Sequence, residues 1–140
     1  MEWTIVNTKF VIGNYKNVVT NDMSKIAAFD LDHTIIKPTN NKKFTLGSDD
    51  WELYSKNVLD KLKKFNNDGY TIAIISNQST ISKNAKNLEI WKKKIDRLAN
   101  AIDIPFIILA SIQKDKYRKP KTKLWEEHIK CNIGESFFCG

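Results

Sequence analysis

The sequence predicts an α/β fold built around a doubly wound parallel sheet. Short apolar runs without polar alternation, typical of strands buried on both faces, recur along the chain. Segments with apolar residues at helical spacing separate these runs, and helical crossovers of this kind join parallel strands. We expect one domain over residues 1–140, because this length supports one main core.

The expected elements follow one another in a regular order. The opening stretch predicts short strands at residues 4–6 and 10–15 around a turn at Gly13 and Asn14. Segments 35–38 and 44–46 are expected to form a small projecting hairpin. Buried strands are predicted at residues 26–29, 70–75, 105–110 and 136–139, and helices at residues 55–66, 87–101 and 121–130.

Apolar stripes at helical spacing support the prediction of the first two helices. Four residues share one face of each helix: Val58, Leu59, Leu62 and Phe65 in the first, and Leu88, Trp91, Ile95 and Leu98 in the second. Asp68 and Gly69 predict the end of the first helix, since glycine commonly follows a helix.

Net charge and composition limit the classes of partner. Lys and Arg number 23 against 16 Asp and Glu, a net charge of +7, and a positive field attracts phosphate polymers such as nucleic acid. The many lysines could instead reflect the base composition of the gene rather than a nucleic-acid partner. No apolar stretch is long enough to cross a membrane, no secretory signal opens the chain, and the two cysteines make no disulfide framework. We expect an intracellular location.

Polar residues follow the apolar runs where strands should end. Asp30 and Asp32 come after the run at 26–29, and Ser76 follows the run at 70–75. Ligands of such sheets bind outside the carboxyl ends of the strands. Two carboxylates this close repel each other, which costs electrostatic energy. This cost indicates either a bound cation such as Mg²⁺ that offsets the repulsion or a reaction that needs both groups. The alternative interpretation is that Asp30 and Asp32 lie in a solvated turn without a functional role.

The order of these residues resembles the haloacid dehalogenase superfamily of phosphotransferases. Its first signature is Asp-x-Asp-x-Thr after a buried strand, matched by Asp30, Asp32 and Thr34. Its second is a Ser or Thr after the next strand, matched by Ser76, and its third is a Lys beyond the third strand, matched by Lys119.

Longer sequence motifs resemble those of the phosphatase half of the polynucleotide kinase/3'-phosphatase family. They are Ser-Asn-Gln at 76–78, Tyr-Arg-Lys-Pro at 117–120 with Trp125, and a Ser-Asp-Trp-like segment ending at Trp51. This resemblance covers residues 26–140. It implies magnesium-dependent removal of 3'-phosphates from nucleic-acid ends in end repair, with DNA favoured over RNA.

The resemblance also assigns roles. Asp30 would be the nucleophile, forming an aspartyl-phosphate, and a metal ligand through its carboxylate. Asp32 would protonate the leaving 3'-oxygen and then activate water, while its backbone carbonyl binds the metal. Ser76 would hold phosphate oxygens, and Lys119 would neutralise the transferring group. Thr34 would fix the loop.

Other residues keep two interpretations each. Asn77 and Gln78 could contact phosphate or order the loop, and Arg118 could contact the nucleic acid or pair with an acid. Trp51 and Trp125 could stack on a base or pack in the core or a lid. His33 stands where the family often has Gly, and it could approach the substrate or be a tolerated loop substitution.

A fourth family motif, an acidic loop after the fourth strand, is expected to be missing. The sequence stops at Gly140, where its Asp would come next, so we expect a domain truncated after the fourth core strand and weak metal binding. The alternatives are a fragment, a natural short form that binds ends without turnover, or a Gly140 carboxylate that replaces the lost ligand.

Two other functions compete with the leading one. A phosphatase for small metabolites or nucleotides would use the same signatures. A non-catalytic module that docks on nucleic-acid ends or on another chain would fit the missing motif. The Tyr-Arg-Lys-Pro motif and the basic charge favour a polynucleotide 3'-phosphatase over a small-molecule phosphatase.

Overall fold

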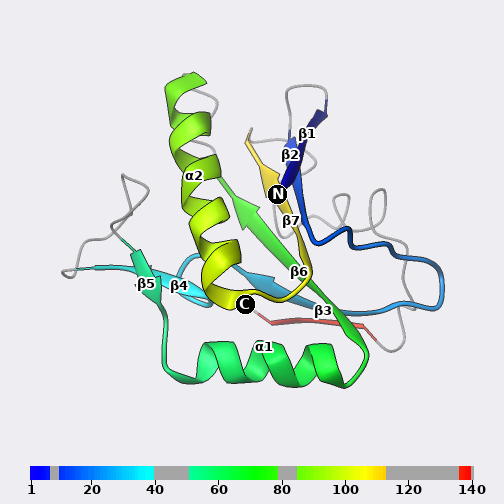
Figure 1. The fold of residues 1–140 in the computed structure, drawn as a ribbon. Coiled ribbons are helices and arrows are strands. Elements are labelled where there is room, and N and C mark those ends of the chain that lie inside the picture. The colour runs from blue at the N-terminus through cyan, green and yellow to red at the C-terminus, as the bar shows by residue number, and fades with distance from the viewer. Residues whose placement is uncertain (7–9, 40–50, 79–84, 113–135, 140) are drawn as a thin grey trace.

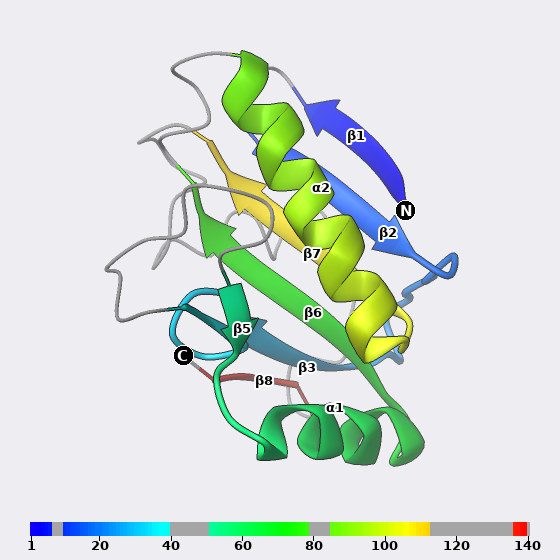
Figure 2. The same ribbon diagram turned by 60° about the vertical axis from the view of Figure 1, so that its left-hand side comes forward.

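The computed structural model describes residues 1–6, 10–39, 51–78, 85–112 and 136–139. Within these ranges one six-stranded sheet has the order β1-β2-β7-β6-β3-β8, and a two-stranded sheet consists of β4 and β5 (Figures 1 and 2). The strands of the large sheet are β1 (Glu2–Val6), β2 (Phe10–Tyr15), β7 (Phe106–Ser111), β6 (Tyr70–Asn77), β3 (Lys25–Asp30) and β8 (Phe137–Cys139).

The core of the large sheet is parallel, as the sequence predicted. β3 pairs in parallel with β6 on one side and with β8 on the other, and β6 pairs in parallel with β7. The alternation of strands and helices gives rise to this arrangement, because a helical crossover returns the chain to the same end of the sheet. The α/β fold class is therefore confirmed.

The first two strands extend this core in the opposite sense. β2 runs antiparallel to β7 and β1 antiparallel to β2, so the complete sheet is mixed. The predicted turn at Gly13 and Asn14 is wrong, since both residues lie inside β2. Gly13 faces Trp3 and Ile108 in the register, and a Cβ placed there would come within 2.7 Å of the Trp3 ring. The glycine serves close packing rather than a turn.

The two predicted helices that fall in the described ranges are confirmed. α1 spans Asn57–Asn67 and α2 spans Ala85–Ile102. After α1, Gly69 adopts a φ of +89°, which favours glycine. Neither described helix is long and apolar enough to cross a membrane. The predicted helix at residues 121–130 lies outside the described residues.

Both helices pack on the same face of the sheet (Figures 1 and 2). Leu62 of α1 and Ile95 of α2 belong to one buried cluster with side chains that alternate along β3 and β6. The intervening side chains of these strands form a second buried cluster on the opposite face: Ile26, Ala28, Ala73 and Ile75, with Leu109 of β7 and Phe10 of β2. Strands buried on both faces explain the unbroken apolar runs in the sequence.

The small sheet differs in part from the expected hairpin. β4 (Ile36–Pro38) pairs antiparallel with β5 (Trp51–Leu53). The segment 44–46, which we expected to be the partner strand, lies outside the described residues. Trp51 is half-buried and packs against the main core cluster, which agrees with the packing interpretation of this residue.

Candidate active site

The first part of the candidate site lies where β3 and β6 end. Asp30 is the last residue of β3, and its register partner on β6 is Ile75, the residue before Ser76. Ser76 in turn pairs with Ala110 of β7. Because parallel strands end at the same edge of a sheet, Asp30 and Ser76 stand beside each other there.

Backbone hydrogen bonds shape the loop that carries Asp32. The Leu31 carbonyl accepts from the N–H groups of Ile35 and Ile36 at 3.0 and 3.1 Å, and the His33 N–H donates to the Ile36 carbonyl at 2.7 Å. His33 has a φ of 61°, a left-handed conformation that costs a residue with a side chain roughly 1 kcal/mol. Glycine would meet this backbone requirement at lower cost, and exposed His33 meets it as a loop residue.

Gln78 connects the loop to the strand ends. Its side-chain Nε2 donates to Asp32 Oδ2 at 2.9 Å and to Ser76 Oγ at 2.7 Å. Its backbone N–H donates to the Ser111 carbonyl on β7 at 2.7 Å. Asp32, Ser76 and Gln78, which the sequence proposed as site residues, are thus joined by direct hydrogen bonds. Of the two roles left open for Gln78, the geometry supports the ordering of the loop.

A buried lysine that sequence reasoning missed approaches the same carboxylate. Lys94 of α2 is 4% exposed, and its Nζ lies 4.0 Å from Asp32 Oδ1. The sequence did contain a signal for it. Lys94 follows Trp91 by three residues and precedes Leu98 by four, which places a charged residue on the apolar stripe of the helix.

The remaining proposed residues are only partly placed. Asn77 is the last residue of β6 and is half-buried. Arg118, Lys119 and Trp125 lie outside the described residues, so their relation to Asp30 and Ser76 stays a prediction.

The oxygen donors near the strand end suit a hard cation. Within the described ranges, no group of three or more His, Cys, Asp or Glu side chains forms a metal cluster. Both oxygens of the Asp32 carboxylate already face a donor or a cation, namely Gln78 and Lys94. The residues present would hold a Mg²⁺ ion through the Asp30 carboxylate and the Asp32 backbone carbonyl, the ligands that the family resemblance implies, with water completing its shell.

A cavity opens on the α1 side of the loop. It has a volume of about 270 Å³, and its lining includes His33 and Thr34 of the loop, Tyr54, and Lys61 of α1. The loop between β3 and β4 therefore borders this cavity through His33 and Thr34.

The sequence model of the family described as polynucleotide kinase 3 phosphatase matches residues 25–140. The chain belongs to this family. The matched range begins at the first residue of β3 and includes every candidate site residue. It leaves out β1 and β2, the two strands that extend the sheet in the antiparallel sense.

Curated relatives of this chain are longer proteins. The bifunctional polynucleotide phosphatase/kinase of Schizosaccharomyces pombe is 32% identical over 130 residues, which cover 93% of this chain and 31% of that protein. The chain thus spans about a third of the length of that relative.

Solved structures show the same fold at low identity. A putative HAD-like phosphatase from Mesorhizobium loti superposes with a TM-score of 0.71 at 17% identity, over 93% of this chain and 69% of the other. The D,D-heptose 1,7-bisphosphate phosphatase of B. bronchiseptica, solved with magnesium and phosphate, gives 0.59 at 16% identity, over 74% and 60% of the two chains. The fold is that of HAD-like phosphatases.

Proposed function

We propose that this chain hydrolyses 3'-phosphate groups at nucleic-acid ends, with DNA favoured, as a step of intracellular end repair. The observation that carries the proposal is the hydrogen-bonded connection from Asp32 through Gln78 to Ser76, beside Asp30 at the carboxyl ends of parallel strands. Membership of the polynucleotide kinase 3 phosphatase family supports the choice of a polynucleotide 3'-phosphate over other phosphate esters.

The first half of the reaction transfers the phosphoryl group to the protein. A carboxylate oxygen of Asp30 attacks phosphorus, and the bond from phosphorus to the 3'-oxygen breaks. Asp32 donates a proton to the leaving 3'-oxygen, so that the nucleic acid departs with a free 3'-hydroxyl group. Ser76 holds phosphate oxygens during this transfer.

The second half regenerates the protein. Asp32 accepts a proton from a water molecule, whose oxygen attacks the phosphorus of the aspartyl-phosphate. The bond between Asp30 and phosphorus breaks, inorganic phosphate leaves, and Asp30 is again a carboxylate. Gln78 keeps the Asp32 carboxylate at one place for both proton transfers through its 2.9 Å hydrogen bond.

Charge neutralisation completes the proposal. Magnesium, held by the Asp30 carboxylate and the Asp32 backbone carbonyl, would supply positive charge to the phosphoryl oxygens when bound. Lys119 is proposed to neutralise the same group, and Arg118 and Asn77 to contact the nucleic acid or phosphate. Lys94 and Gln78 face the two oxygens of the Asp32 side chain, which supports the use of the Asp32 main chain rather than its side chain for the metal.

Phosphate release from a 3'-phosphorylated oligonucleotide and from a sugar phosphate, each with magnesium, tests this function. We expect release from the oligonucleotide, its loss on chelation of magnesium, and its loss in Asp30→Asn with binding of the oligonucleotide retained. Asp60→Asn, an exposed position on α1, is the matched control and should keep full turnover. Preference for the sugar phosphate would favour a small-molecule phosphatase, and binding without turnover at any magnesium concentration would favour an end-binding module.

A further inference from the structure

Lys94 is buried to an extent that is unusual for its residue type. Its side chain is 5% exposed, although an ammonium group loses much of its hydration when it is removed from water. Lysine is almost never fully buried without a partner, and an apolar residue would pack on the α2 stripe at lower cost. The charge at this position therefore calls for a functional explanation.

One partner of this charge is the carboxylate that the proposed reaction uses for proton transfer. Lys94 Nζ lies 4.0 Å from Asp32 Oδ1, at the outer limit of an ion pair, while Gln78 Nε2 donates a hydrogen bond to Asp32 Oδ2 at 2.9 Å. The two contacts come from different elements, α2 and the end of β6, and act on different oxygens. Together they favour one orientation of the carboxylate.

We propose that Lys94 is a positioning residue for Asp32, which it holds together with Gln78 in the orientation required for proton transfer to the leaving 3'-oxygen. This inference rests on the proposed function. It assigns to α2 a direct part in the site, although the signatures recognised in the sequence lie on the strands and the loops after them.

Burial of Lys94 argues against a role in holding the nucleic-acid chain. A backbone-binding lysine needs its ammonium group at the surface, where phosphates can reach it. Lys93, the preceding residue on α2, is exposed, whereas Lys94 turns inward to Asp32. Loss of the Lys94 charge should therefore affect the rate of the reaction more than the binding of the polymer.

The first experiment compares Lys94→Met, Lys94→Arg and Lys93→Met with the unmodified chain on a 3'-phosphorylated oligonucleotide. Met keeps the unbranched shape without the charge. We expect kcat to fall roughly 10- to 100-fold in Lys94→Met with KM little changed, because small misplacement of a reacting group has effects of this size. Arg should restore part of kcat. Lys93→Met removes the same charge at an exposed position and should leave kcat unchanged.

A thermal unfolding scan separates positioning from a merely structural role. Lys94→Met removes a desolvated charge, and Asp32 remains 43% exposed to water, so we expect an unchanged or higher Tm together with the lower kcat. A parallel fall of Tm and kcat, a rise in KM at constant kcat, or full kcat in Lys94→Met would each overturn the inference.

A double-mutant cycle tests the contact without any turnover. The urea midpoints of Asp32→Asn, Lys94→Met and the double variant should be non-additive, with Asp32→Asn costing less stability when Lys94 is absent. Additive effects would show that the two residues are not coupled and would overturn the inference. If the unmodified chain binds the oligonucleotide but releases no phosphate, the proposed function fails, and the catalytic role of Lys94 fails with it even where the cycle shows coupling.

Discussion

Gln78 organises the candidate site at the scale of single residues. Its side chain reaches both Asp32 and Ser76, and its backbone N–H is bonded to Ser111. The sequence placed Gln78 beside Ser76 as a candidate site residue because Ser-Asn-Gln follows an apolar strand. It could not choose between a contact with phosphate and an ordering role, since that choice depends on where the loop from β3 lies.

Gln78→Leu should reduce kcat about 10- to 100-fold, because the Asp32 carboxylate loses the hydrogen bond that orients it. The fold should be retained, since the backbone bond from Gln78 to Ser111 does not depend on the side chain. Single-turnover kinetics and a thermal scan measure the two effects. Full kcat in Gln78→Leu would contradict the positioning of Asp32 by this residue.

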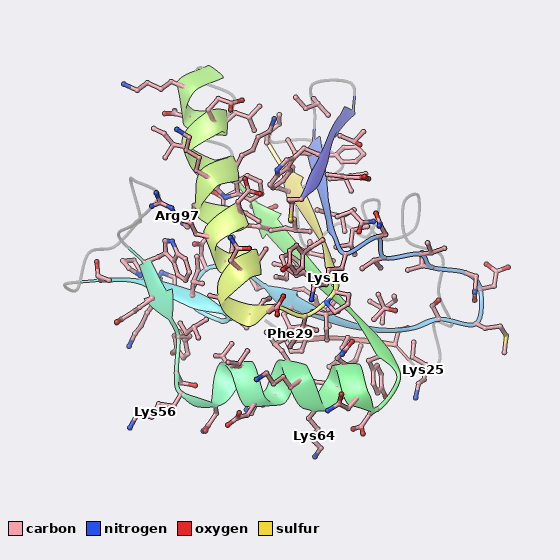
Figure 3. The ribbon with its side chains drawn as sticks, in the orientation of Figure 1. Lys16, Lys25, Phe29, Lys56, Lys64 and Arg97 are labelled. Carbon is pink, nitrogen blue, oxygen red and sulfur yellow. The ribbon has the colours of Figure 1, made fainter. Side chains whose placement is uncertain are left out.

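At the scale of elements, a polar cluster connects the end of β2 to the end of α2. Tyr15 donates its hydroxyl hydrogen to Asp103 Oδ1 at 2.8 Å, and Lys16 Nζ lies 2.9 Å from the same oxygen. The hydrogen bonds from Lys16 and Tyr15 hold the pKa of Asp103 below its ordinary value. The hydrogen bond to Asp103 also raises the pKa of Tyr15 and of Lys16. In Figure 3, Lys16 lies close to the lower end of α2.

Asp103→Asn should lower Tm at neutral pH and much less at the extremes. A lowered carboxyl pKa contributes stability above the ordinary Asp value of about 4, and this contribution is lost as the pH falls through the folded-state value. The raised pKa values of Tyr15 and Lys16 contribute below about 10 and are lost as the pH rises further.

The measurement is Tm against pH for both chains, with Asp22→Asn in an exposed turn as the control. The difference between wild type and Asp103→Asn should form a plateau between the two limits. It should also shrink in high salt, because the three groups are at the surface. A difference that is constant across the pH range would contradict the role of charge.

The interior of β2 gives a second prediction at this scale. A Cβ at Gly13 would lie 2.7 Å from the Trp3 ring and 2.9 Å from a methyl carbon of Ile108, so Gly13→Ala must displace β1 or β7 side chains. Overpacking of this kind costs roughly 1–3 kcal/mol. Urea unfolding measures the loss, and Trp3→Leu combined with Gly13→Ala should recover part of it. An unchanged midpoint in Gly13→Ala would show that the space between the strands is larger than this geometry implies.

At the scale of the whole molecule, a net charge of +7 accompanies a site that contains paired acidic residues. Lys56 and Lys64 extend outward from the α1 region, and Arg97 extends from the side of α2 (Figure 3). The described surface thus carries positive charge on both helices. A distribution of this kind would attract a phosphate polymer by its field, while Asp30, Asp32 and Ser76 lie at or just after the ends of parallel strands.

Salt should therefore weaken binding of a 3'-phosphorylated single strand. If three phosphates are neutralised, the affinity falls roughly 20-fold between 50 and 200 mM salt, because counterion release sets the slope. Fluorescence anisotropy at several salt concentrations measures this slope. A 3'-phosphorylated mononucleotide is the control and should show a much smaller dependence. An oligonucleotide affinity that does not change with salt would argue against a polymer as the substrate.

The local pattern of the sequence determined the elements and the order of the site residues. Unbroken apolar runs predicted β3, β6 and β7, and helical stripes predicted α1 and α2, because the burial of a strand or helix is encoded in neighbouring residues. Because Asp30, Asp32, Ser76 and Gln78 follow these apolar runs closely in the sequence, the sequence also predicted that they lie at or after the ends of strands. The predicted turn at Gly13 is wrong, since a local pattern does not show that another strand packs against this residue.

The tertiary structure alone decided which of these residues meet. The order β1-β2-β7-β6-β3-β8, the antiparallel pairing of β2 with β7, and the approach of Lys94 to Asp32 join residues that are far apart in the sequence. Such contacts depend on how a helix crosses the sheet and which strand edge remains open, and these are properties of the whole packed core. A lysine on an apolar stripe thus becomes interpretable only when the carboxylate opposite it is known.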